Sequence, residues 1–127
     1  MSVAAAGGHK ECVELLIASG ANVTAKNGYG STPLHSVSTK EIAELLISNG
    51  ADINAKINDG TSPLIAAAMR GNKDVAEILI AKGAKVNLKS KTVTGEDKTA
   101  LDWATDQSHM DLFNLISKHG GKKAKEL

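Results

Sequence analysis

The sequence predicts an all-α solenoid in which similar helix-turn-helix units are stacked and joined by β-hairpin-like loops. The first observation is a segment that recurs four times: LLIASGAN at 15–22, LLISNGAD at 45–52, ILIAKGAK at 78–85 and LISKHGGK at 115–122. The second is an independent landmark, TPL at 32–34, SPL at 62–64 and TAL at 99–101, which keeps the same register. Self-similarity at a period of roughly 33 residues is the signature of a repeat array.

A first helix is expected to begin at Thr32-Pro33 in the second unit and at Ser62-Pro63 in the third. The hydroxyl can accept a hydrogen bond from an amide of the first turn, and proline lacks the amide hydrogen that this turn leaves free. In the third unit the apolar, Ala-rich segment continues to Arg70, and Gly71 is expected to end the helix.

A second, more amphipathic helix follows in each unit, with apolar residues at helical spacing. The four copies are Cys12, Val13, Leu15 and Leu16; Ile42, Ala43, Leu45 and Leu46; Val75, Ala76, Ile78 and Leu79; and Leu112, Phe113, Leu115 and Ile116. We expect one buried apolar face in every copy, with the Cys12 thiol inside it. Gly20, Gly50, Gly83 and Gly120 suit the left-handed residue that closes a helix.

Together these motifs resemble ankyrin repeats. The resemblance rests on TPLH at 32–35, SPLIAAA at 62–68, GHKECVELLIASGANV at 8–23, KEIAELLISNGADINAK at 40–56 and DVAEILIAKGAKVN at 74–87. It covers nearly the whole chain as a single domain, with units at 1–26, 27–56, 57–89 and 90–121 and a basic, solvated tail at 122–127. The closing segments, TALDWA and LISKHGGK, resemble the last repeat of ankyrin proteins common in bacteria.

Composition narrows the classes of function. The formal net charge is only +1, which gives no general attraction to nucleic acid or to an anionic membrane. Aromatic residues make up 2% of the chain, which argues against a large aromatic-lined cofactor cavity. The single cysteine excludes an internal disulfide, and no segment resembles a signal peptide or a membrane span. We therefore expect a cytoplasmic protein that needs no cofactor.

The polar residues suggest neither a catalytic nor a metal site. The four histidines, His9, His35, His109 and His119, lie in different units, and no pair has the HExxH spacing of a zinc site. For His35, the resemblance implies a structural hydrogen bond near the hairpin. Asp102 and Asp106 lie four residues apart and can share a helix face, but without a third ligand we favour a solvent-exposed face. The sequence predicts a protein that is not an enzyme.

The resemblance implies a protein-protein interaction module whose partner binds a concave surface of hairpin tips and first-helix residues. The residues at these positions are Tyr29, Ser31, Asn58, Asp59, Thr61, Met69, Arg70, Asp106 and Gln107. Tyr29, Met69 and Arg70 are the strongest candidates, because Tyr and Arg are enriched in interface hot spots and Met adapts to irregular surfaces. Trp103 is expected to pack between first helices instead. The alternative is a truncated or engineered array with no partner of its own.

Three units depart from the regular length. The second is three residues shorter than the third near the end of its first helix, which predicts a shorter helix and a notch in the concave wall. That notch is either a specificity pocket or tolerated decay of the repeat. Segment 90–98 of the fourth unit is longer and predicts a projecting hairpin. The first unit has only the latter part of a first helix, so we expect it to fray, or to pair with a second copy of an otherwise monomeric protein.

Overall fold

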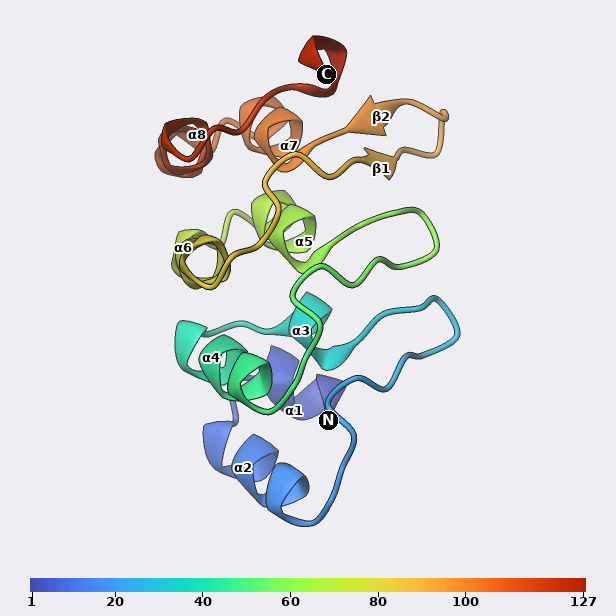
Figure 1. Cartoon of the computed structure of the whole chain (residues 1–127), viewed down its shortest axis with the longest axis vertical. Helices are drawn as coiled ribbons and strands as arrows, with labels where there is room; N and C mark the ends of the chain where they lie inside the picture. Colours follow the sequence, from blue (N-terminus) through green and yellow to red (C-terminus); the bar gives the residue numbers. More distant parts are fainter.

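The computed structural model describes residues 1–127, apart from the side chain of Ser2. Its helices form antiparallel pairs: α1 (Ser2–Ala6) with α2 (Lys10–Ala18), α3 (Pro33–Ser36) with α4 (Lys40–Ser48), α5 (Pro63–Arg70) with α6 (Lys73–Ala81), and α7 (Ala100–Asp106) with α8 (Met110–Lys118). The first helices stack in one column and the second helices in another, while the loops project from the opposite side of the first column (Figure 1). The expected all-α solenoid is confirmed.

The helix boundaries follow the predicted signals. As predicted, Ser62 Oγ accepts a hydrogen bond from the Ile65 amide at 3.3 Å. Thr32 precedes α3 as expected, but its hydroxyl lies 3.0 Å from His35 Nδ1 instead of capping a first-turn amide. In the fourth unit Thr99 Oγ1 accepts a hydrogen bond from the Asp102 amide at 3.3 Å. Gly71 ends α5 in the left-handed region with φ 69°. The glycines that follow the second helices also have positive φ, with values of 90°, 96°, 95° and 85° at Gly20, Gly50, Gly83 and Gly120.

A continuous apolar core lies between the two columns. Leu34 and Leu64 enter it from the first helices, and Leu46 and Leu79 enter it from the second helices, each at most 1% exposed. Burying one such side chain stabilises the folded state by about 1.5–3 kcal/mol. Because each unit packs only on its neighbours, this core extends from one end of the stack to the other.

The expectation of a buried apolar face in every second helix is wrong for the first unit. Cys12 is exposed, and Leu15 and Leu16 are 69% and 36% exposed. The residues that correspond to Cys12 and Leu16 in the other units are at most 1% exposed: Ile42, Leu46, Val75, Leu79, Leu112 and Ile116. In those units the preceding second helix lies over this side, whereas α2 has α4 as its single neighbour among the second helices. We call Cys12, Leu15 and Leu16 the N-terminal end face.

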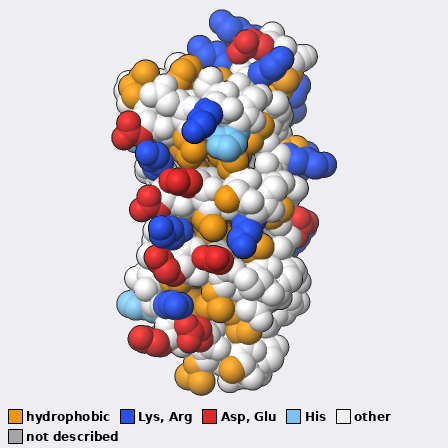
Figure 2. All heavy atoms as spheres, turned by 60° about the vertical axis from the view of Figure 1, so that its left-hand side comes forward, with side chains coloured by type: hydrophobic (Ala, Val, Ile, Leu, Met, Phe, Trp, Pro, Cys, Tyr) orange, Lys and Arg blue, Asp and Glu red, His pale blue; other side chains and the backbone are white. Residues whose placement is uncertain are grey.

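The opposite end of the stack is polar, and its tail is not simply solvated as expected. Thr99 Oγ1 donates to the Lys122 carbonyl at 2.6 Å, the Lys122 amide donates to Asn87 Oδ1 at 2.8 Å, and the Ala124 amide donates to Asp102 Oδ2 at 2.8 Å. The tail then forms a short 3₁₀ helix, η1 (Ala124–Glu126). In Figure 2, charged side chains crowd this upper end, whereas hydrophobic side chains reach the lower, N-terminal end.

The two length irregularities have the predicted consequences. Helix α3 has 4 residues and α5 has 8, so the first helix of the second unit is shorter, as expected. In the fourth unit, β1 (Ser90–Lys91) pairs antiparallel with β2 (Asp97–Lys98) to form the projecting hairpin. Among the residues that the structure describes, no helix has the length and apolarity that crossing a membrane requires.

Candidate functional site

The loop of the second unit is shaped by Asn27, whose side chain folds back on the turn. Its Oδ1 accepts hydrogen bonds from the amides of Tyr29 at 2.9 Å and Ser31 at 3.1 Å. Gly30 closes the turn with φ 82°, a left-handed conformation that costs glycine little. This arrangement presents the Tyr29 side chain outward, 75% exposed, while Ser31 is half-buried behind it.

In the loop of the third unit, a carboxylate takes the place of the asparagine amide and accepts the hydrogen bonds of the turn. Asp59 Oδ1 accepts hydrogen bonds from the Thr61 amide at 2.9 Å and from Thr61 Oγ1 at 2.6 Å. Thr61 is only 5% exposed, so the expectation that it lies exposed at the hairpin tip is wrong. Asn58 and Asp59 are exposed, as predicted.

Backbone hydrogen bonds hold successive loops in register. The Asn58 amide donates to the Tyr29 carbonyl at 2.9 Å, and the Lys91 amide donates to the Asp59 carbonyl at 2.8 Å. Gly60 lies at a close approach, because a Cβ at this position would be 2.8 Å from the Lys89 carbonyl oxygen. The hairpin tips consequently form one connected surface beside the first helices (Figure 1).

A hollow of about 280 Å³ lies between these loops and helices α3 and α5. We call it the central hollow; it is lined by Ser31, His35, Ser36, Ile57, Asp59, Thr61, Ala66, Met69 and Arg70. It brings together Ser31, Asp59, Thr61, Met69 and Arg70 of the predicted binding residues. Met69 is 38% exposed, and together with Ile57 and Ala66 it gives the hollow apolar walls.

Arg70 is exposed but held in place by the second unit. Its Nη1 donates to the His35 carbonyl at 2.9 Å and its Nη2 donates to the Val37 carbonyl at 3.3 Å. These carbonyls belong to the end of the shortened helix α3, where the following turn is missing. Partial burial lowers the pKa of Arg70 from its usual value, although a guanidinium stays charged at neutral pH.

His35 forms the base of the same region. Its Nε2 lies 2.9 Å from the Ala55 carbonyl oxygen and 3.0 Å from the Thr61 carbonyl oxygen. Because carbonyls only accept, Nε2 carries the proton, and Nδ1 accepts the Thr32 amide hydrogen at 3.0 Å. Burial lowers the pKa of His35 more than these hydrogen bonds raise it. The structural hydrogen bond implied for His35 is present and joins the second unit to the loop of the third.

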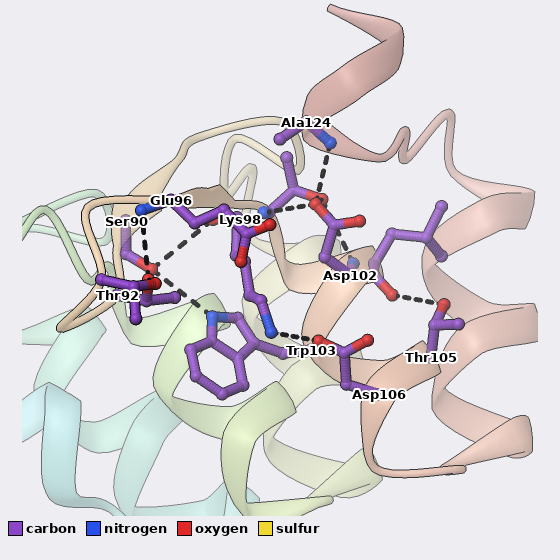
Figure 3. A network of polar contacts seen from close by, with 12 residues as sticks. Ser90, Thr92, Glu96, Lys98, Asp102, Trp103, Thr105, Asp106 and Ala124 are labelled. Carbon is purple, nitrogen blue, oxygen red and sulfur yellow. Dashed lines mark hydrogen bonds and ion pairs between the residues drawn. The ribbon is translucent and has the colours of Figure 1, made fainter.

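The last two predicted binding residues, Asp106 and Gln107, lie outside the central hollow at the end of α7. Asp106 pairs with Lys98 Nζ, which lies 4.7 Å from the ring centroid of Trp103 (Figure 3). The hydrogen bond from Lys98 to Asp106 raises the pKa of that ammonium group. Gln107 is exposed at the C-cap of α7. Asp106 thus lines a separate hollow of about 280 Å³ near the tail.

Trp103 is half-buried and packs against the apolar core, with its Nε1 donating to Ser90 Oγ at 3.4 Å (Figure 3). The corresponding residues of the second and third units are Ser36 and Ala66, which line the central hollow. In the fourth unit a large side chain therefore fills this position. In the second and third units, small side chains leave it open.

Neither Asp102 nor Asp106 is arranged as a metal ligand. Asp102 Oδ2 accepts hydrogen bonds from the amides of Thr99 and Ala124 at 3.0 and 2.8 Å, and Asp106 is paired with Lys98. In the part of the chain that the structure describes, no three His, Cys, Asp or Glu side chains cluster as a metal site would require.

The sequence reasoning missed Ile57, Ala66 and Ser36 as walls of the central hollow. Ile57 directly precedes the predicted tip residues Asn58 and Asp59, so its position in the sequence could have indicated that it lies beside the binding surface. Ala66 and Ser36 could have been found by comparing units, because the fourth unit has Trp103 in the same position. Lys73, which directly follows the turn after Arg70, was also missed as a second cation near that side chain; the two line one larger hollow.

Comparison with known proteins adds one match. A family model described as Ankyrin repeats (3 copies) matches residues 1–57 and 38–126, which together span most of the chain. A comparison with curated proteins gave no match.

Proposed function

The chain belongs to the ankyrin-repeat family, and from this premise we propose that it binds a protein partner through the hairpin tips and the central hollow. Ankyrin repeats are generally protein-protein interaction modules, and the family is typically non-enzymatic. The partner surface of this chain comprises Tyr29, Asn58 and Asp59 at the tips together with Met69 and Arg70 beside the hollow.

The observation that carries this proposal is the central hollow itself. It combines apolar walls with an exposed tyrosine tip next to it, and hot spots form where such apolar contacts are enclosed by polar groups. The loops that frame it are fixed by backbone hydrogen bonds, so little ordering entropy opposes binding. Asp106 and Gln107 lie beyond this hollow and form the outer part of the surface.

Photo-crosslinking tests the location of the partner site. A photoreactive benzoylphenylalanine replaces Met69 in one variant and Glu77, exposed on α6 among the second helices, in the control. We expect a specific protein from the source cell to be crosslinked from position 69 and not from position 77. Tyr29→Ala should reduce that crosslink severalfold. Equal crosslinking from both positions contradicts the proposed surface, and no crosslinked protein at all favours an array without a partner.

We also propose that the N-terminal end face pairs with the same face of a second copy. It exposes Leu15 and Leu16, whereas in the other three units the equivalents of Leu16 are buried and those of Leu15 are half-buried. Head-to-tail stacking is disfavoured, because the tail is bonded over the last unit and Ser117 replaces the isoleucines at positions 17, 47 and 80. Pairing of two N-terminal end faces is therefore favoured over head-to-tail stacking.

Sedimentation velocity across the micromolar to millimolar range tests this pairing. The unchanged chain should shift toward a dimer as its concentration rises, and Leu15→Lys should remain monomeric. Val93→Lys is the matched control, since Val93 is likewise an exposed apolar residue but lies at the tip of the β1–β2 hairpin. A chain that stays monomeric throughout refutes the pairing and leaves the partner site unaffected.

A further inference from the structure

A second and larger hollow, of about 660 Å³, lies where the second unit lacks a helical turn. We call it the notch. It is lined by Ala6 of the first unit, by 36–38 after the short helix α3, and by 70–74 at the turn between α5 and α6. The hollow is thus a direct product of the shortened unit.

Hydrogen bonds from the neighbouring units hold the backbone around the notch in place. Arg70 binds the carbonyls of His35 and Val37, and Asn72 Nδ2 donates to the Ser38 carbonyl at 3.0 Å. On its other side, Ser38 Oγ donates to the Ala5 carbonyl at 3.3 Å. Side chains of the third unit therefore satisfy the backbone groups that the missing turn would have covered.

The guanidinium of Arg70, which lines the notch, still has N–H groups that can bind a ligand there. It carries five N–H donors, and the two bonds to carbonyls leave its charge without an acidic partner. The ion pairs recorded among the described residues, Lys10–Glu14, Lys82–Glu44, Lys91–Asp97 and Lys98–Asp106, all use lysine. Lys73 adds a second cation to the lining and Asp74 a single anion, so the notch has a net positive charge.

The notch and the central hollow meet at Arg70. Ser36 and Arg70 line both, with the apolar walls of Ile57, Ala66 and Met69 on one side and the positive lining on the other. A chain segment that crosses Arg70 therefore meets an apolar environment and a cationic one in succession.

We propose that the two hollows together bind an extended segment of a protein partner in which an acidic side chain lies close to an apolar one. The apolar side chain occupies the central hollow, and the carboxylate enters the notch and pairs with Arg70, with Lys73 nearby. Arg-carboxylate hydrogen bonds are among the stronger polar contacts in proteins. This inference rests on the proposed protein-binding function and specifies the chemistry of the segment that binds.

A carboxylate fits this site better than a polyphosphate or a nucleic acid does. Asp59 lines the central hollow and Asp74 lines the notch, so an extended polyanion would meet an acidic group on either side of Arg70. The formal net charge of +1 supplies no wider positive field to offset that repulsion.

A library of random peptides displayed on phage provides the probe. Peptides selected on the unchanged chain should share an Asp or Glu within a few residues of an apolar residue. The synthetic peptides should lose roughly tenfold in affinity when the acid becomes its amide, which corresponds to about 1.4 kcal/mol. On Arg70→Gln the same peptide change should alter affinity by less than about twofold, because the paired charge is already absent.

Lys73→Glu separates charge recognition from support of α3, because Lys73 makes none of the hydrogen bonds that hold the notch. It should weaken the acidic peptides severalfold without lowering the thermal midpoint, because an acidic residue is favoured in the first turn of a helix. Lys85→Glu, at an exposed position after α6 that lines neither the notch nor the central hollow, is the matched control and should leave affinity unchanged.

The outcomes distinguish this inference from the function on which it rests. Selected peptides without an acidic preference, or with equal affinity for the unchanged chain, Arg70→Gln and Lys73→Glu, overturn the recognition of a carboxylate. If Met69→Ala still weakens those peptides, the protein-binding surface stands. If neither Met69→Ala nor Tyr29→Ala has an effect, the proposed surface falls as well.

Discussion

In the second and fourth units, the third residue of the first helix bonds to the segment that follows it in the stack, and its side chain differs between the two. His35 joins the Thr32 amide to the carbonyls of the next loop. Asp102 occupies the same position in the fourth unit and joins the Thr99 amide to the amide of Ala124 in the tail. Between them, Ile65 is apolar and 1% exposed. The polar residue matches the next segment: a donor meets carbonyls, and an acceptor meets an amide.

Stability should depend on pH through His35. Burial lowers the pKa of His35 in the folded chain, whereas the unfolded chain takes up the proton near its ordinary pKa of about 6.5. The unfolded state therefore binds more protons as the pH falls below that value, and the free energy of unfolding decreases. The change is at most about 1.4 kcal/mol per pH unit and vanishes above the unfolded pKa. Urea denaturation between pH 7.5 and pH 5 measures it.

His35→Gln should flatten this pH dependence, since the buried titrating group is gone. His119→Gln is the matched control, because His119 is exposed at the C-cap of α8. If the His35→Gln chain loses as much stability on acidification as the unchanged chain, His35 is not the source of the effect.

Single residues were the least predictable part of the site. The TPLH motif was enough to assign His35 a structural hydrogen bond. Arg70 was predicted only as an exposed contact, because its bonds to His35 and Val37 cross a unit boundary that a sequence does not display. Thr61 was expected at the surface, but it is buried and its hydroxyl donates to the neighbouring Asp59. The contacts of Arg70 depend on residues distant in the sequence, and those of Thr61 depend on a hydrogen bond within its own loop.

At the scale of elements, prediction was more successful, since helix ends depend on local chemistry. The shortened α3, the glycine closures and the extended hairpin all followed from signals within a few residues. The docking of the C-terminal tail could not be predicted in this way, because its bonds to Asn87, Thr99 and Asp102 join segments that are distant in the sequence. Cys12 and Leu16 have a helical pattern like that of the buried copies, yet burial also needs a neighbouring helix.

The loops after the second helices are tied from unit to unit by an asparagine that the first unit lacks. Asn54 Oδ1 accepts the Lys85 amide at 2.9 Å, and Asn87 Oδ1 accepts the Lys122 amide at 2.8 Å. The corresponding residue of the first unit is Thr24, whose hydroxyl instead donates to Asn22 at 2.6 Å. The joint between the first and second units therefore lacks this side-chain bond.

Replacing Thr24 with Asn should supply the missing link to the Asp52 amide. A typical intramolecular hydrogen bond contributes about 0.5–1.5 kcal/mol, so Thr24→Asn should raise the free energy of unfolding by an amount in that range. Amide hydrogen exchange should also slow at Asp52. Thr24→Ala removes the hydroxyl without adding an amide and should not protect Asp52. Unchanged exchange in Thr24→Asn would show that the side chain does not reach this amide.

At the scale of the whole molecule, the two ends of the stack are built differently. One end exposes Leu15 and Leu16, and the other is covered by the bonded tail. Nearest-neighbour contacts dominate the stability of a repeat array, so a unit with one neighbour opens more easily than a unit with two. The central hollow lies between the second and third units, whereas the notch also borders the weaker first unit through Ala6.

Hydrogen exchange should therefore show a gradient along the stack. In the monomeric Leu15→Lys chain, amides of α2 should exchange roughly tenfold faster than those of α6, which corresponds to an opening free energy lower by about 1.4 kcal/mol. Using this variant removes any protection by a second copy. Deleting residues 122–127 should raise exchange in α8 while α6 remains protected, because α7 and α8 lose the tail that is bonded to their unit. If α2 is as protected as α6, its single neighbour suffices to hold it, and the asymmetry of the ends has no energetic consequence.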